Sequence, residues 1–277
     1  MSQIPQVPMA SAAPLSGRPL GVLEATSLGW RLLMSDFWRL WLVAVLEILI
    51  VWGAGTFGFV ATLVVLPPMA AGLFFVVARR IEGGTVEVGD LFAAFKDRFA
   101  ESVVAFLPVW GVSLAVGALL ACVLAVFFVL GAGVVGAAGG DEEVAAVTVV
   151  LGILAFMGVV AVVSLAVQLT MLLFTFLMPA IWGHPGSGWE AAKASVRLAW
   201  SRFFSVLGLA ILFWFIHSAA NLLGMCLCCV GLLVTMPAVV VWQMATIGYL
   251  YRSWTGRPLT VTALPPVPPP MRSAPLP

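Results

Sequence analysis

The chain has 277 residues, of which 62% are hydrophobic and only 9% are charged, and its formal net charge is +1. A soluble domain carries about 25% charged residues. This chain therefore cannot build a water-facing surface, and we expect the lipid bilayer to cover most of it. Protein partners or further copies of the chain are the other expected partners, and nucleic acid is not one.

Both ends of the chain are rich in proline. Prolines recur through residues 1–21 and again through residues 256–277. Proline fixes φ and lacks a backbone donor, so we predict a disordered tail at each end of one transmembrane domain over residues 22–255. Residues 1–20 have no apolar core behind a basic start, so no cleavable signal peptide is expected.

The first segment after the N-terminal tail is amphipathic. Residues 22–36 place small and apolar side chains at helical spacing, with Glu24 and Arg31 away from that stripe. This pattern predicts a helix lying in the membrane interface; a plain extension of the first span is the alternative. A second interfacial helix is predicted over residues 89–100, where Leu and Phe side chains form one face.

The design of the first segment returns at residues 188–202, which predicts a third interfacial helix. Aligned without gaps, the two copies share Glu24/Glu190, Ala25/Ala191, Arg31/Arg197, Leu32/Leu198, Ser35/Ser201 and Phe37/Phe203. We interpret the chain as two related halves around a middle hairpin. The three interfacial helices together form what we call the collar.

Six apolar runs are predicted to cross the membrane as helices, since one span needs about 20 apolar residues. They are expected at about 38–57, 60–80, 103–132, 146–180, 204–225 and 231–251. The blocks 102–140 and 144–182 each hold about 38 residues, nearly twice one span. An eight-span arrangement therefore stays open beside the six-span one.

The placement of the basic residues predicts the orientation. One side of the six-span arrangement carries Arg31, Arg39, Arg79, Arg80, Lys96, Arg98, Lys193, Arg197, Arg202, Arg252 and Arg257. The charges of the opposite side are Asp141, Glu142 and Glu143. Because basic loops stay in the cytoplasm, we expect a multi-pass protein of the cell membrane with both termini cytoplasmic.

Five residues with carboxyl, amide or imidazole groups lie deep within the predicted spans. Glu47 is the only formal charge among them, and a carboxylate at bilayer depth costs about 2.5–3.5 kcal/mol. It is either linked to a proton or substrate, or held neutral or paired for structural reasons. Gln168, His217, Asn221 and Gln243 are the others, and side chains of this kind commonly bond one helix to another.

The chain carries no recognised signature of chemistry. It lacks G-x-S-x-G, H-E-x-x-H, a P-loop and paired membrane aspartates, so we expect no enzyme, no catalytic residues and no cofactor. Cys226 and Cys229 have C-x-x-C spacing, but they lie among Leu, Met and Val near a predicted turn. Packing in lipid is favoured there over zinc binding, and no metal site is expected.

Several short stretches resemble a known family. They are Gly89-Asp-Leu-Phe-Ala-Ala-Phe-Lys96 after Arg79-Arg80-Ile-Glu-Gly-Gly, Met178-Pro-Ala-Ile-Trp, Glu190-Ala-Ala-Lys-Ala-Ser-Val-Arg-Leu, Phe203, and Gly231-Leu-Leu-Val-Thr-Met-Pro237. Together they resemble a bacterial family of six-span membrane proteins of largely unknown function. That family is similar to the membrane domain attached to some glycerophosphodiester phosphodiesterases.

The resemblance covers roughly residues 22–255 and implies a bacterial inner-membrane protein. No phosphodiesterase catalytic domain accompanies it here, so that activity does not carry over. A Pro-Gly break expected early in the fourth span is also missing, between residues 144 and 168.

Two functions follow from these features as expectations. The leading one is a non-enzymatic membrane protein that organises lipid or partner proteins through its cytoplasmic collar. The candidate surface residues are Arg31, Lys96, Arg98, Lys193 and Arg197. The alternative is a transporter of a small solute or lipid with a site between the two halves, because Pro67 and Pro237 interrupt corresponding helices.

Overall fold

A computed structural model of the chain describes residues 19–137, 142–184, 186–226 and 230–259. Every element in these residues is a helix, and six helices are long and apolar enough to cross a membrane. The predicted all-α transmembrane bundle is confirmed. Most of the two predicted disordered tails, 1–18 and 260–277, lies outside the described residues.

The first half consists of an interfacial helix and a helical hairpin. α1 (Val22–Ser35) and α2 (Phe37–Thr56) are separated only by Asp36, whose φ of −149° lies outside the helical region. Gly58 has a φ of 106°, which favours glycine, and there the chain turns back into α3 (Phe59–Ile81). Each helix begins and ends within one residue of its predicted bounds.

The prediction of one interfacial helix over residues 89–100 is wrong, because the structure has two shorter elements there. The chain instead forms a 3₁₀ turn, η1 (Val88–Phe92), and one short helix, α4 (Ala93–Asp97). This backbone lies directly on α3, since a Cβ added to Gly72 would be 1.8 Å from the carbonyl oxygen of Leu91. Packing against α3 therefore overrides the helical periodicity of the sequence.

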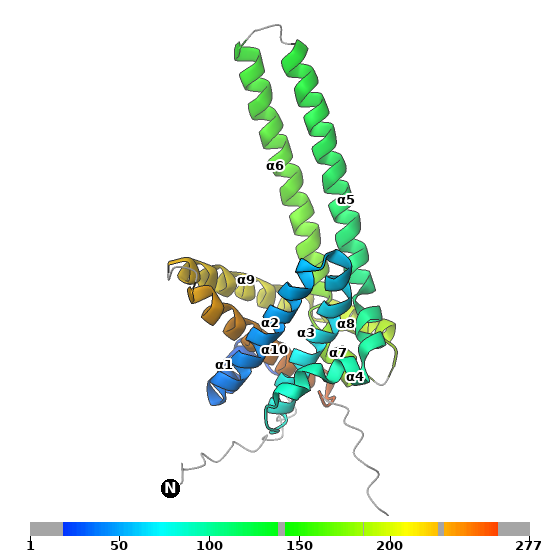
Figure 1. The fold of residues 1–277 in the computed structure, drawn as a ribbon, viewed down its shortest axis with the longest axis vertical. Helices are drawn as coiled ribbons and strands as arrows, with labels where there is room; N and C mark the ends of the chain where they lie inside the picture. The colour runs from blue at the N-terminus through cyan, green and yellow to red at the C-terminus, as the bar shows by residue number, and fades with distance from the viewer. Residues whose placement is uncertain (1–18, 138–141, 185, 227–229, 260–277) are drawn as a thin grey trace, which may run out of the picture.

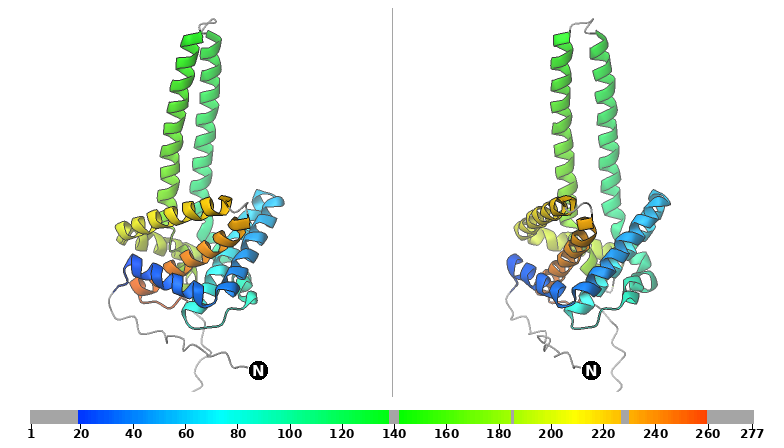
Figure 2. Two further views of the ribbon diagram at one scale, coloured as in Figure 1. Left: turned by 90° about the vertical axis from the view of Figure 1, so that its left-hand side faces the viewer. Right: turned by 60° about the vertical axis from the view of Figure 1, so that its left-hand side comes forward.

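The middle of the chain forms a long hairpin of α5 (Phe99–Ala137) and α6 (Glu142–Leu173). It projects well past the other helices, and α9 runs across its lower end rather than alongside it (Figure 1 and Figure 2). The blocks 102–140 and 144–182, each of which could have held two short spans, thus begin as one unbroken helix each. At 1.5 Å per residue, the 39 residues of α5 extend about 58 Å.

The predicted fourth span, 146–180, is interrupted. α6 ends at Leu173, the chain makes a turn, and α7 (Leu177–Gly183) follows. Pro179 has no N–H to offer the carbonyl of Thr175, and the turn is closed instead by short-range bonds such as Leu177 N to Phe174 O at 3.0 Å. Proline is tolerated in the first turn of α7 because its N–H would be unpaired there anyway.

The second half repeats the order of the first. α8 (Gly188–Ser201), α9 (Phe203–Cys226) and α10 (Val230–Thr255) follow one another, and α10 runs four residues past its predicted end at 251. The aligned residues Ser35 and Ser201 both end an interfacial helix. The packing differs, however, since α1 lies mainly against α10 whereas α8 lies mainly against α5.

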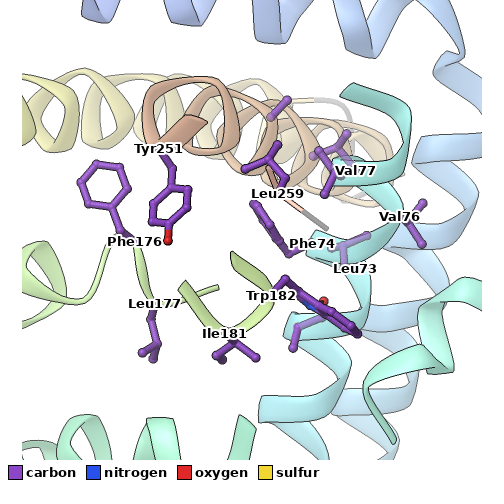
Figure 3. Close-up of a cluster of buried hydrophobic side chains, with 14 of the residues drawn as sticks. Leu73, Phe74, Val76, Val77, Phe176, Leu177, Ile181, Trp182, Tyr251 and Leu259 are labelled. Carbon is purple, nitrogen blue, oxygen red and sulfur yellow. The ribbon is translucent and has the colours of Figure 1, made fainter. Parts of the chain in front are cut away.

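A compact core joins the two halves at the base of the hairpin. Phe74 of α3, Phe176 before α7 and Tyr251 of α10 are almost completely buried there, and Figure 3 shows them converging with Trp182. Leu259 is also buried, and its N–H donates to Glu82 Oε1 at 2.8 Å. The predicted disordered tail from 256 onward therefore begins too early, because Leu259 packs into this core.

The two ends of the described chain lie side by side. Leu20 N–H donates to Ser253 Oγ at 2.7 Å, and Trp254 Nε1 donates to Leu20 O at 3.2 Å. Because six spans return the chain to its starting side, this pairing agrees with the predicted parity. The collar segments α1, α4 and α8 lie in the lower half of Figure 1, with the chain ends and away from the hairpin tip.

Candidate functional site

The polar residues of the spans do not form one site. Glu47 lies on α2, Gln168 on α6, His217 and Asn221 on α9, and Gln243 on α10. Gln168 and Asn221 are exposed on the apolar surface, and His217 and Gln243 are half-buried. Within the described residues no hydrogen bond or ion pair joins any two of them. The structure thus does not assemble them into a polar pocket.

Glu47 is the exception in burial, with a relative exposure of 8%. It shares the buried face of α2 with Leu40, Val43 and Ala44. That helix packs against α3 and α10, which carry Pro67 and Pro237. Its carboxyl makes no hydrogen bond in the part of the chain that the structure describes, so this buried group is the strongest intramembrane candidate.

The five collar cations fall into two classes. Arg31, Lys96, Lys193 and Arg197 are exposed. Arg98 is not, because its side chain is only 18% exposed and lies 4.0 Å from the carboxylate of Glu101. The collar can therefore offer the first four cations to a ligand, whereas Arg98 joins α4 to α5.

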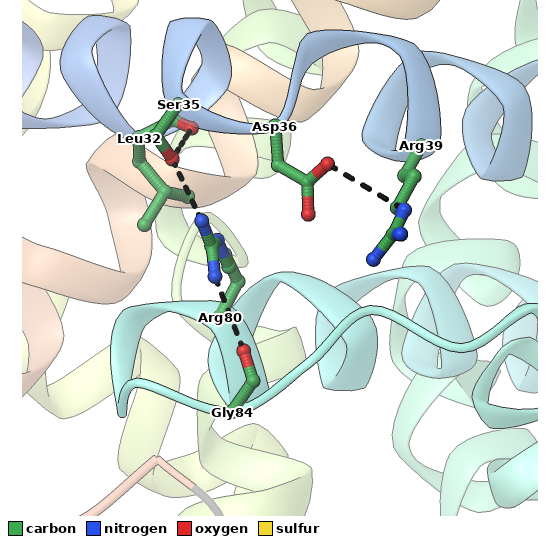
Figure 4. A network of polar contacts seen from close by, with 6 residues as sticks. All are labelled: Leu32, Ser35, Asp36, Arg39, Arg80 and Gly84. Carbon is green, nitrogen blue, oxygen red and sulfur yellow. Dashed lines mark hydrogen bonds and ion pairs between the residues drawn. The ribbon is translucent and has the colours of Figure 1, made fainter. Parts of the chain in front are cut away.

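Other basic residues hold the base of the bundle together. Arg80 reaches from the end of α3 to Ser35 Oγ at 3.3 Å and Gly84 O at 3.4 Å (Figure 4). Arg79 pairs with Asp90 of η1, and Arg39 lies 3.9 Å from Asp36. The contacts of Arg80 and Arg79 tie α1, α3 and η1 to one another.

A groove lies along the outer face of α8, and we call it the α8 groove. Its lining comprises Pro108, Phe174, Trp189, Ala192, Lys193, Val196, Arg197 and Trp200, and its volume is about 380 Å³. Pro108 comes from α5 and Phe174 follows α6, so three parts of the chain build it. This lining is apolar apart from the cations Lys193 and Arg197, and such a lining suits an amphipathic ligand.

A comparable groove of about 350 Å³ lies beside α1, and we call it the α1 groove. Its lining comprises Thr26, Ser27, Trp30, Ile216, Ala238, Val239 and Trp242. The aligned pair Ser27 and Lys193 occupies equivalent places in the two grooves. The α1 groove has no charged lining residue, and Arg31, the counterpart of Arg197, is not part of it.

A third polar cluster closes the lower end of the bundle. His184 follows α7, with its Nδ1 3.3 Å from Tyr251 Oη and its Nε2 2.6 Å from Arg257 Nη1. Arg257 Nη1 also lies 2.9 Å from Nδ1, and because a guanidinium can only donate, the neutral ring is the acceptor in its contact with Arg257. Burial, and then the Arg257 guanidinium, lower the pKa of His184 below 6.5, whereas Glu190 acts in the opposite direction.

The sequence reasoning found the cations of the α8 groove but missed its tryptophans. Trp189, Lys193, Arg197 and Trp200 are spaced by four, four and three residues, which places them on one helical face. That signal was available in the sequence. The contributions of Pro108 and Phe174 depend on tertiary packing and could not be predicted from the sequence.

Metal chemistry has no support in the described part of the chain, where no three His, Cys, Asp or Glu side chains gather. Cys226 is exposed at the end of α9, and residues 227–229 of the C-x-x-C stretch lie outside the described residues.

Comparison with known proteins found no matching family model, no matching curated protein and no matching solved structure. The function must therefore be argued from the residues and their geometry.

Proposed function

We propose that the protein is a non-enzymatic integral membrane protein that organises phospholipids at the cytoplasmic face of a bacterial inner membrane through its collar. The observation that carries this proposal is the α8 groove, where exposed cations and tryptophans border an apolar trough. The family resemblance of the sequence supports the bacterial setting. The gathering of basic residues on one side supports the orientation.

The chemistry of the collar matches the lipid headgroup region. Trp30, Trp189 and Trp200 are 55%, 49% and 69% exposed, and tryptophan is enriched where hydrocarbon meets headgroups. Each exposed cation near an anionic membrane surface gains about 1 kcal/mol. Four such cations on the collar give the protein a preference for anionic lipids in its immediate surroundings.

Electron spin resonance of reconstituted protein tests this proposal. Spin-labelled phosphatidylglycerol and spin-labelled phosphatidylcholine are compared for the fraction that the protein immobilises. We expect phosphatidylglycerol to be preferred, and the preference to shrink in about 0.5 M salt, which screens exposed charges. A variant with Arg31, Lys96, Lys193 and Arg197 all changed to Gln should lose it. Equal immobilisation of both lipids by the unaltered protein contradicts the proposal.

A transporter is the second candidate, and the burial of Glu47 favours it. Its unpartnered carboxyl lies on the face of α2 that packs against α3 and α10. Pro67 and Pro237 lie inside these two helices without breaking them, so the interruption expected from the sequence is wrong. Transport requires a water path to this residue. Glu47→Cys, in a background without the four native cysteines, should then react with a water-soluble thiol reagent. Inertness from both sides of the membrane excludes this candidate.

A further inference from the structure

The two related halves carry grooves of similar size but different charge. The α8 groove includes Lys193 and Arg197, and the α1 groove includes no charged residue. We propose that the α8 groove holds one anionic phospholipid from the surrounding bilayer, with its phosphate bound at Arg197. This inference rests on the proposed function and deepens it, because it assigns a specific site to one half of the collar.

The electrostatics of the groove point to Arg197 as the phosphate ligand. Lys193 Nζ lies 3.0 Å from Glu190 Oε1 and 5.8 Å from the ring centre of Trp189, so a carboxylate already offsets its charge. Arg197 has no ion pair among the described residues and lines the groove one turn further along. A guanidinium binds a phosphate through two parallel N–H donors, so Arg197 supplies the uncompensated charge and the geometry.

The apolar part of the groove explains why the ligand is a lipid rather than a free phosphate. Val196, Phe174 and Pro108 line it, and they offer an acyl chain a surface that a soluble anion cannot use. Trp189 and Trp200 lie about three turns apart on α8. Exposed tryptophans of this kind lie at headgroup depth, which places Arg197, between them, at the level of lipid phosphates.

The groove is built into the fold rather than being a loose surface feature. A Cβ added to Gly188 would be 1.9 Å from the carbonyl oxygen of Glu101, so α8 begins in direct contact with α5. The buried Ser195 donates from Oγ to Leu173 O at 3.1 Å, which joins the middle of α8 to the end of α6. These two contacts hold α8 at a fixed distance from Pro108 and Phe174.

The gapless repeat supplies a matched control for the experiment. Arg31 aligns with Arg197, is exposed on the related helix α1, and lies outside the α1 groove. Arg31→Gln and Arg197→Gln remove the same charge from equivalent positions of the collar. A general attraction between collar and membrane responds equally to both changes, whereas a lipid site in the α8 groove responds more strongly to Arg197→Gln.

Native mass spectrometry of the full chain, released from bilayers with equal amounts of phosphatidylglycerol and phosphatidylcholine of the same acyl chains, measures the retained lipid. We expect one phosphatidylglycerol to be retained in preference. Arg197→Gln should reduce that preference about fivefold, equivalent to about 1 kcal/mol, and Arg31→Gln should reduce it less, because Arg31 lies outside the α1 groove. Arg197→Lys, which keeps the charge but loses the fork, should reduce it less.

The outcomes separate this inference from the proposed function. Equal responses of Arg31→Gln and Arg197→Gln, with phosphatidylglycerol still preferred, overturn the site and leave the proposed function standing. No preference for phosphatidylglycerol in the unaltered protein, in this measurement and in spin resonance, overturns both. Displacement of the retained mass by inorganic phosphate alone also overturns the inference, because a free anion then suffices.

Discussion

At the scale of single residues, two glycines set how closely the collar approaches the bundle. Gly72 allows the backbone of η1 to lie on α3, and Gly188 allows the first turn of α8 to lie on α5. In both cases an added Cβ would meet a backbone carbonyl rather than the movable end of a side chain. The collar cannot move away without losing buried contacts, so these two positions require glycine.

Gly72→Ala should therefore destabilise the protein, because its Cβ would lie 1.8 Å from Leu91 O. Overpacking of this kind costs about 1–3 kcal/mol, which should lower the thermal midpoint measured in detergent. The control is Gly117→Ala on α5, where an added Cβ meets nothing within 4 Å. If both alanine variants unfold at the same temperature, the close approach of η1 to α3 is wrong.

His184 makes the lower end of the bundle sensitive to pH. Its pKa is below 6.5 in the folded protein, first through burial and then through Arg257. As the pH falls through 6.5, the unfolded chain takes up a proton that the folded chain refuses. The contribution of His184 to the free energy of unfolding is therefore fully present above pH 6.5. It decreases as the pH falls below 6.5, and the decrease stops once the pH is below the pKa of His184 in the folded protein.

His184→Gln should remove this dependence, because glutamine can accept from Arg257 at any pH. The thermal midpoint of the unaltered protein should fall between about pH 8 and about pH 5.5, and that of the variant should fall less. His217→Gln on α9 is the matched control, since no hydrogen bond links His217 to a described residue, and it should keep the full dependence. Identical pH profiles for the three proteins contradict this role of His184.

At the scale of helices, indole hydrogen bonds connect elements that are distant in sequence. Trp182 Nε1 donates to Ala71 O at 2.8 Å, Trp242 Nε1 to Thr26 O at 3.0 Å, and Trp41 Nε1 to Val234 O at 3.2 Å. Each joins two helices through a backbone carbonyl. Because lipid offers no competing hydrogen bond, these contacts favour one arrangement of the helices over others.

Trp182→Phe tests this contribution at the indole whose hydrogen bond is buried. It removes the bond to Ala71 O and part of the volume packed against Phe75, whose ring centre is 4.5 Å away. A lost hydrogen bond costs about 0.5–1.5 kcal/mol, and the cavity adds to it. Trp214→Phe, at a side chain 60% exposed, is the control. Equal stabilities of the two variants contradict the account.

The sequence predicted α1, α2, α3, α8 and α9 closely because apolar periodicity and local breaks mark their ends. It did not predict the turn at Phe174, since that block has no glycine or proline between Gly158 and Pro179. The break follows from the missing N–H of Pro179 acting four residues earlier. Lys193 and Arg197 were predicted as surface candidates, but the α8 groove was not, because Pro108 and Phe174 of its lining are distant in sequence.

At the scale of the whole molecule, the α5–α6 hairpin stands apart from the other spans. Ser102, Ala105 and Val109 are buried at its base, and none of residues 110–126 is buried. Its length of about 58 Å is nearly twice the hydrocarbon core of a bilayer. In a membrane it must therefore tilt strongly or extend past the headgroups on the side opposite the collar.

The orientation of the collar connects the fold to the proposed function, because anionic lipid headgroups attract it only if it faces them. The two ends of the described chain meet beside α1, and the start of α6 lies at the far end of the hairpin (Figure 1). One membrane surface should therefore expose Lys193 of the collar together with Thr255 at the end of α10. Glu142, the first residue of α6, should be exposed at the other surface.

Labelling of single cysteines with a membrane-impermeant thiol reagent tests this arrangement most directly. Lys193→Cys, Thr255→Cys and Glu142→Cys are each placed in a background without the four native cysteines. We expect Lys193→Cys and Thr255→Cys to react only in inverted inner-membrane vesicles, and Glu142→Cys to react only in intact cells. Reaction of all three from one side, or the reverse pattern, contradicts the account.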